Sequence, residues 1–135
     1  MRSDRLRVLM LWLAIVATGC ASSSFGPEAR TLLGRWEWVS SHGGIAGVTQ
    51  TPASTGRTMT LVFTADTAAL WVDGALSRST GYRLSDPVAE GEFEVLYVEP
   101  LQGFATQTGS FPAPDSLRLA DGCCDGFTSW YVRTR

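Results

Sequence analysis

The most reactive side chains of this 135-residue sequence belong to two adjacent cysteines, Cys123 and Cys124. In an oxidising compartment such a pair can form a strained vicinal disulfide, remain as two free thiols, or link two chains. A bridge between neighbours closes almost no loop, so it would add little stability. Adjacent cysteines also lack the Cys-x-x-Cys spacing of thioredoxin-like and zinc sites, and we expect neither function here.

The other candidates for chemistry are weaker. His42 is the only histidine and has no serine or cysteine at the spacing of a defined catalytic motif, so we interpret it as a solvated residue. Glu90, Glu92 and Glu94 alternate as on one face of a strand, and we expect that face to be the solvated exterior. The chain contains no lysine, which excludes Schiff-base catalysis. We therefore predict that the protein is not an enzyme and holds no metal or cofactor.

The first 20 residues have the order of a secretory signal peptide: three arginines, an apolar run from Val8 to Ala17, and then small residues. The run is 10 residues long, whereas a membrane-spanning helix needs about 20. The segment Ala17-Thr18-Gly19-Cys20 resembles the lipobox of bacterial lipoproteins. The resemblance implies cleavage after Gly19 and attachment of acyl chains such as palmitate to Cys20. An ordinary signal peptide with a chance cysteine is the alternative.

Two or more acyl chains anchor a protein stably in a membrane. Ala21 follows the cysteine, and by analogy this favours the outer membrane, with the protein facing the periplasm of the bacterial envelope. Residues 1–19 are then the signal peptide, residues 20–27 the lipidated cysteine and tether, and residues 28–135 one domain. Removing three arginines and one aspartate with the signal peptide leaves eight arginines and twelve acidic residues, a net charge of about −4. This balance argues against nucleic-acid binding.

After Gly34 the sequence alternates between apolar and polar residues in short runs, which is the pattern of β-strands. Asp73-Gly74 between two such runs predicts a two-residue hairpin. A short helical turn is expected in residues 27–34. We predict an all-β fold, a single antiparallel up-and-down β-barrel of about eight strands. The predicted strands are residues 35–41, 57–64, 67–73, 75–85, 92–100, 101–109, 115–120 and 126–135.

Gly34-Arg35-Trp36 after a helical turn resembles the opening of the lipocalin and calycin superfamily, whose first strand carries a Gly-x-Trp motif. The resemblance implies a lipocalin-like barrel in which an arginine near the last strand packs across that tryptophan. Arg133 is the matching residue, and a guanidinium over an indole ring is a favourable cation–π pair. Residues 40–57 form a long, glycine-rich connection, which we expect to be either a lid over the barrel mouth or a mobile surface loop.

A barrel of this size either encloses one small ligand or is filled by its own side chains. In the first case the protein binds a small hydrophobic or amphipathic ligand. We expect that pocket to be lined by Trp38, Met59, Leu61, Phe63, Tyr82 and Tyr97. The alternative is a protein-binding barrel with a filled core, whose loops carry an apolar patch for an envelope partner or a protease.

Overall fold

The computed structural model describes residues 32–85 and 89–135. The predicted signal peptide, Cys20 and the tether lie outside the described residues, as does most of the predicted helical turn. Within the described ranges, no helix has the length and apolar character needed to span a membrane.

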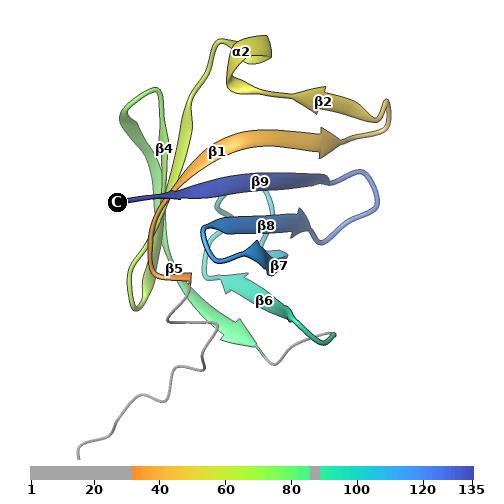
Figure 1. Cartoon of the computed structure of the whole chain (residues 1–135). Coiled ribbons are helices and arrows are strands. Elements are labelled where there is room, and N and C mark those ends of the chain that lie inside the picture. The colour runs from red at the N-terminus through yellow and green to blue at the C-terminus, as the bar shows by residue number, and fades with distance from the viewer. Residues whose placement is uncertain (1–31, 86–88) are drawn as a thin grey trace, which may run out of the picture.

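Nine strands and one short helix make up the described part of the chain (Figure 1). They are β1 (Gly34–Gly43), β2 (Val48–Gln50), α2 (Pro52–Thr55), β3 (Met59–Phe63), β4 (Thr67–Val72), β5 (Ala75–Ser85), β6 (Glu92–Tyr97), β7 (Thr106–Ala113), β8 (Ser116–Asp121) and β9 (Phe127–Thr134). From β3 to β9 each strand pairs with the next, and β1 pairs with both β3 and β9. Eight antiparallel strands thereby close into a barrel, with β2 added beside β1, which confirms the predicted fold class.

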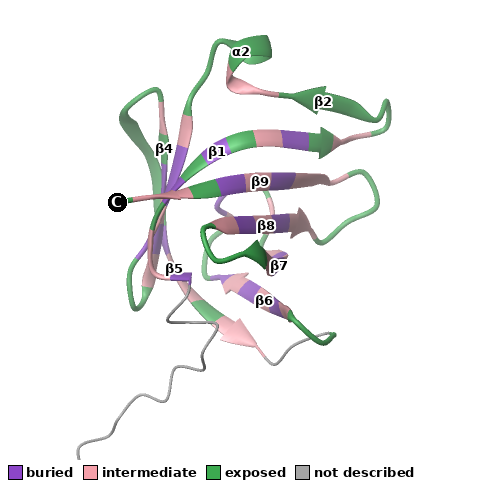
Figure 2. Ribbon diagram, viewed as in Figure 1, coloured by how far each residue is buried: buried purple, intermediate pink, exposed green. Residues whose placement is uncertain are grey.

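Alternation along the strands divides the side chains between the interior and the surface. In β1, Trp36 and Trp38 are buried while Glu37 between them is exposed. In β6, Phe93 and Val95 are buried in the same alternating way. Figure 2 shows the resulting bands of buried and exposed residues along the barrel wall. Because each large apolar side chain contributes roughly 1.5–3 kcal/mol when buried, this alternation fixes the register of the strands.

The hairpin predicted at Asp73-Gly74 joins β4 to β5. Both residues have positive φ angles, 51° and 81°, which a two-residue type I′ turn requires. The Asp73 carboxylate also accepts a hydrogen bond of 2.8 Å from the backbone N–H of Thr58. The turn therefore joins β4 to β5 and also holds the chain that enters β3.

The closed end of the barrel is built around Trp36 and Arg133, which are cross-strand partners on β1 and β9. The Arg133 Cζ lies 4.2 Å from the centroid of the Trp36 ring. Its Nη1 donates to the Leu33 carbonyl at 2.7 Å, and the Trp36 Nε1 donates to the Leu32 carbonyl at 2.8 Å. Gly34 has a φ of 124°, and a Cβ there would lie 3.0 Å from Arg133 Nη1. The Gly-x-Trp segment thus requires glycine for both conformation and space.

The expectation of a long unstructured connection in residues 40–57 is wrong. β1 continues to Gly43 because β9 pairs with it as far as Phe127. The chain then turns and forms β2, which pairs back onto β1. A capping box between Thr51 and Ser54 starts α2. The segment is therefore a projecting hairpin and a helical turn, held by local hydrogen bonds.

The sixth predicted strand, residues 101–109, is only half correct, because β7 begins at Thr106. Leu101 is 4% exposed and belongs to the core. Gln102 donates from Nε2 toward the Tyr131 hydroxyl at 3.4 Å. The connection between β6 and β7 therefore folds back onto the barrel interior before β7 starts.

We predict that replacing Trp36 by alanine lowers the free energy of unfolding by about 3–5 kcal/mol, since a fully buried indole leaves a large cavity. Arg133→Ala is expected to cost about 1–3 kcal/mol through loss of the cation–π contact and the bond to Leu33. Urea denaturation measures both changes. Arg118→Ala is the control, because its ion pair with Glu92 is 4.0 Å long and partly exposed, and it should cost under about 1 kcal/mol. Equal losses for the two arginines would contradict a special role for Arg133.

Candidate functional site

The barrel wall is interrupted between β1 and β3. β1 pairs with β3 from Gly34 to Glu37, and it pairs with β2 only from Ser41 onward. Between the two ladders the chain leaves the wall through α2 and returns at Met59. β1 and β3 therefore diverge toward α2, as Figure 1 shows.

A hollow of about 440 Å³ lies at this interruption. Its size falls within the range of sites that bind small molecules, roughly 300–1,000 Å³. It is lined by Arg35, Glu37, Trp38, Pro52, Thr58, Met59, Thr60, Trp71 and Gly74. We name this set of nine residues the wall hollow.

The wall hollow combines apolar surfaces with a charged rim. Trp71 is 36% exposed on the outer face of β4 and supplies most of the apolar surface. Trp38 also lines the hollow but belongs to the core, with 5% of its surface exposed, and its Nε1 donates to the Ser41 hydroxyl at 2.8 Å. Arg35 and Glu37, both exposed, bring one charge of each sign. The arrangement suits a molecule with an apolar body and a polar head.

The six residues predicted to line one pocket lie in three different places. Trp38 and Met59 line the wall hollow. Leu61 and Phe63 are 0% and 2% exposed and fill the core, where the Phe63 ring packs edge-on against Tyr82 at 5.2 Å. Tyr82 and Tyr97 line a second hollow. The structure therefore does not bring the six together around one cavity.

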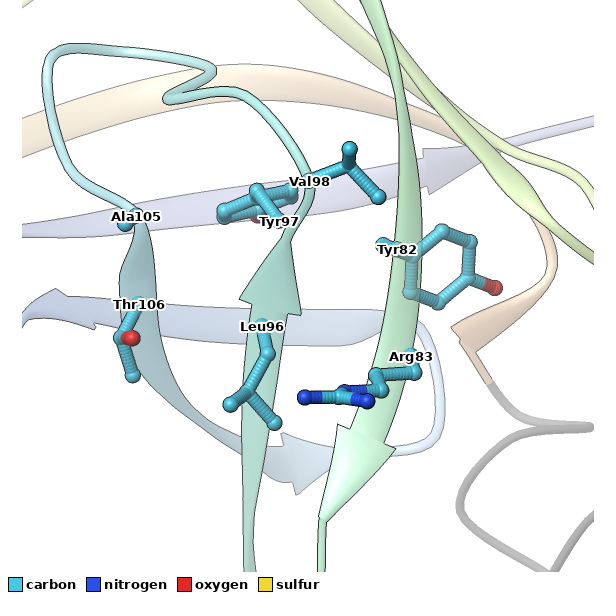
Figure 3. A pocket seen from close by; sticks show the side chains of 7 residues that line it. All are labelled: Tyr82, Arg83, Leu96, Tyr97, Val98, Ala105 and Thr106. Atoms are coloured by element: carbon cyan, nitrogen blue, oxygen red, sulfur yellow. The ribbon is translucent and has the colours of Figure 1, made fainter.

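The second hollow, of about 390 Å³, lies over β5, β6 and β7 (Figure 3). Arg83 pairs across the sheet with Leu96, and Leu96 pairs with Thr106, so the three side chains stand on the same outer face. The hydroxyls of its two tyrosines are already engaged: Tyr82 donates to the Thr64 carbonyl at 2.7 Å, and Tyr97 donates to Gln107 at 2.8 Å. The groups that this hollow leaves available for contact are therefore mainly the Arg83 guanidinium and aliphatic side chains such as Leu96 and Val98.

At the barrel end opposite the Trp36–Arg133 contact, the interior is polar. Gln107 accepts from the Tyr97 hydroxyl and donates from Nε2 to Asp121 Oδ1 at 2.7 Å. Asp121 Oδ2 accepts from the backbone N–H of Phe127 at 2.8 Å. The Ser41 and Ser129 hydroxyls lie 2.6 Å apart across β1 and β9. We name Ser41, Tyr97, Gln102, Gln107, Asp121, Ser129 and Tyr131 the mouth cluster.

The mouth cluster is suited to fixing structure, and its tyrosines stay neutral. Burial raises the pKa of Tyr131 to about 12, an effect only partly offset by hydrogen bonds from Gln102 and Ser129. Burial also raises the pKa of Tyr97, with smaller contributions from Tyr131 and Asp121. Phenols with raised pKa values do not supply a base or nucleophile at neutral pH.

The remaining sequence candidates have structural or solvent-facing positions. His42 is exposed, and its Nδ1 lies 2.9 Å from the Thr49 hydroxyl, across the β1–β2 hairpin. Glu94 accepts from the Ser85 hydroxyl at 2.9 Å on the outer face of β6, and Glu90 is exposed. Among the described residues, no group of three or more His, Cys, Asp or Glu side chains could hold a metal ion.

Cys123 and Cys124 are exposed in the turn between β8 and β9, and their sulfurs lie 3.2 Å apart. A hydrogen bond from the Cys124 thiol lowers the pKa of Cys123, and the backbone N–H groups of Cys124 and Asp125 add to the effect. The pair is therefore accessible, and the lowered pKa increases the fraction of Cys123 present as thiolate.

Arg35 and Trp71 are not among the residues predicted to line the pocket. Both alternate regularly on their strands, and nothing in that pattern marks them as neighbours of a gap in the wall. Gln107 lies two residues before Gly109 on β7, so the two share a strand face, and both are buried. A polar residue in an inward position is the signal of a buried hydrogen-bond network.

Comparisons with protein-family models, with curated proteins and with solved structures find no match for this chain.

We predict that the domain loses stability in alkali because of the mouth tyrosines. An unfolded tyrosine ionises near pH 10, whereas Tyr131 in the folded state ionises at about 12. The unfolded state therefore releases its proton first, and stability falls as the pH rises between these values. Tyr131 alone should cost about 2 kcal/mol between pH 10 and pH 12. Urea denaturation at several pH values measures this loss, and Tyr131→Phe should make the pH dependence shallower. An unchanged slope would contradict the assignment.

Proposed function

We propose that this chain is a membrane-anchored bacterial lipoprotein whose lipocalin-like barrel binds a small hydrophobic or amphipathic ligand in the wall hollow. The lipobox-like segment that ends at Cys20 supports the anchor. The closed eight-stranded barrel and its Trp36–Arg133 contact support the lipocalin-like class. The wall hollow is the single observation that carries the ligand.

The proposed binding place is the wall hollow and not the barrel axis. The axis is occupied at the closed end by Trp36, Phe63 and Phe93, all at most 2% exposed. At the other end Leu101 and the mouth cluster fill the interior. In the wall hollow, by contrast, Trp71 keeps about a third of its surface exposed and can be covered by a ligand.

The chemistry of the wall hollow indicates the class of ligand. Trp71 and Met59 favour an apolar or aromatic body, because burial of such surface is the main favourable contribution to binding. Arg35 and Glu37 at the rim favour a polar head with both donor and acceptor groups. An amphipathic molecule of modest size meets both requirements.

A second candidate function is protein binding through the β1–β2 hairpin. Ile45 at its tip is 91% exposed, and Val48 on β2 is 44% exposed. β2 pairs with β1 alone among the described strands, so its outer edge is free to accept an extended segment of a partner. The filled barrel axis favours this candidate, with an envelope protein or a protease as the partner.

The anchor is tested by Cys20→Ser. Because the lipid is expected on this cysteine, the variant should lose the acyl mass from its N-terminal peptide and leave the membrane fraction. Membrane fractionation and mass spectrometry of that peptide measure the two effects. A wild-type chain without added acyl mass would contradict the lipoprotein assignment.

The ligand is tested by native mass spectrometry of the full chain extracted from bacterial membranes in mild non-ionic detergent. We expect a reproducible extra mass that denaturation removes and that Trp71→Ala abolishes, since Trp71 supplies the exposed apolar wall. Leu76→Ala is the matched control, because Leu76 is the exposed cross-strand partner of Trp71 and lies outside the wall hollow.

A bare mass for the wild type would argue against the ligand and for the second candidate. A photo-crosslinker at position 45 would then be expected to join the chain to an envelope protein. The same extra mass in wild type and in Trp71→Ala would place the ligand elsewhere.

A further inference from the structure

The turn between β8 and β9 presents two thiols in a fixed arrangement. Cys123 and Cys124 are exposed, with their sulfurs 3.2 Å apart. The Asp121 carboxylate holds the turn from one side, by accepting from the Phe127 N–H at 2.8 Å. The Gly126 N–H donates to the Cys123 carbonyl at 2.9 Å inside the turn. The two sulfurs are therefore held next to each other on an ordered turn.

We propose that Cys123 and Cys124 form a vicinal dithiol that is oxidised reversibly to an intrachain disulfide by exchange with a low-molecular-weight disulfide. This inference is independent of the ligand and of lipidation at Cys20. It assigns a modification site to the exposed end of the molecule near the mouth cluster.

The exchange proceeds in two balanced steps. The Cys123 thiolate attacks one sulfur of the external disulfide, forms a mixed disulfide, and releases one thiolate. Cys124 then gives up its proton and attacks the Cys123 sulfur, which forms the vicinal bond and releases the second thiolate. The chain loses two protons and two electrons, which together are two hydrogen atoms, and the external disulfide is reduced to two thiols.

The lowered pKa of Cys123 increases its thiolate fraction, which favours it as the attacking residue. Cys124 lies within reach of the Cys123 sulfur, which makes it the resolving residue. The neighbouring carboxylates of Asp121 and Asp125 should disfavour anionic disulfides and favour neutral or cationic ones.

The surroundings also argue against a structural disulfide. A bond between adjacent residues closes almost no loop, so it removes little entropy from the unfolded chain. The barrel is closed by strand pairing and its core, neither of which involves the cysteines. Formation and reduction of the bond can therefore occur without unfolding the domain.

The test uses the full chain with Cys20→Ser, which leaves Cys123 and Cys124 as the only thiols. The reduced protein is incubated with 2-hydroxyethyl disulfide, a neutral probe, and followed by intact mass spectrometry. We expect the intact mass to fall by the mass of two hydrogen atoms. Digestion without reductant should give one peptide with a disulfide between its two cysteines, and dithiothreitol should restore the original mass.

Two further variants test whether both cysteines are needed. With Cys124→Ser added, the reaction should stop at one mixed disulfide on Cys123. With Cys123→Ser added, it should stop at one mixed disulfide on Cys124, and neither variant should form the intrachain disulfide. A covalent dimer, or stable adducts on both cysteines of the parent chain, would overturn the proposal.

Discussion

The contact between Trp36 and Arg133 is the interaction on which the rest of the structure depends. It joins the first strand of the barrel to the last, and the hydrogen bond from Arg133 to the Leu33 carbonyl spans 100 residues of sequence. Bringing together residues so far apart in sequence costs conformational entropy, and favourable contacts must offset this cost. The stacked guanidinium, its bond to the Leu33 carbonyl and the β1–β9 ladder supply those contacts. Once β1 and β9 are joined, each strand from β3 to β9 pairs with the next in sequence, and among the described strands only β2 lies at an edge of the sheet.

The two ends of the barrel interior differ in polarity. Around Trp36, aromatic rings stack on one another, with Phe93 and Phe111 at 5.0 Å. Toward the mouth, hydroxyl, amide and carboxylate groups are paired with each other instead. Buried polar groups are costly when unpaired, so such a network specifies one arrangement of the β6–β7 connection and the β8–β9 turn. The end that carries the loops is therefore held by directional bonds, and the opposite end by packing.

The sequence predicted the parts of the fold that depend on local rules. Alternation placed Trp36 and Trp38 inside, and Asp73-Gly74 marked a turn that does have two positive φ angles. It did not predict the β1–β2 hairpin, because β1 continues to Gly43 only through pairing with Phe127, which is distant in sequence. Leu101 was predicted to start a strand because it is apolar. Its side chain is buried because the connection between β6 and β7 folds inward, which the local sequence does not reveal. The six predicted pocket residues are divided between the core and two hollows, because inward alternation identifies core residues and gives no measure of the space left between them.

The wall hollow forms where β1 changes its pairing partner from β3 to β2. β1 is ten residues long and twists, whereas β3 is five residues long and follows it only to Glu37. Beyond that point β2 provides a partner for the projecting end of β1, and the chain must leave the wall between them. A continuous eight-stranded wall would have buried Met59 fully, whereas Met59 is only partly buried here, beside Trp38 in the core. The departure at α2 leaves a hollow of about 440 Å³ next to Met59.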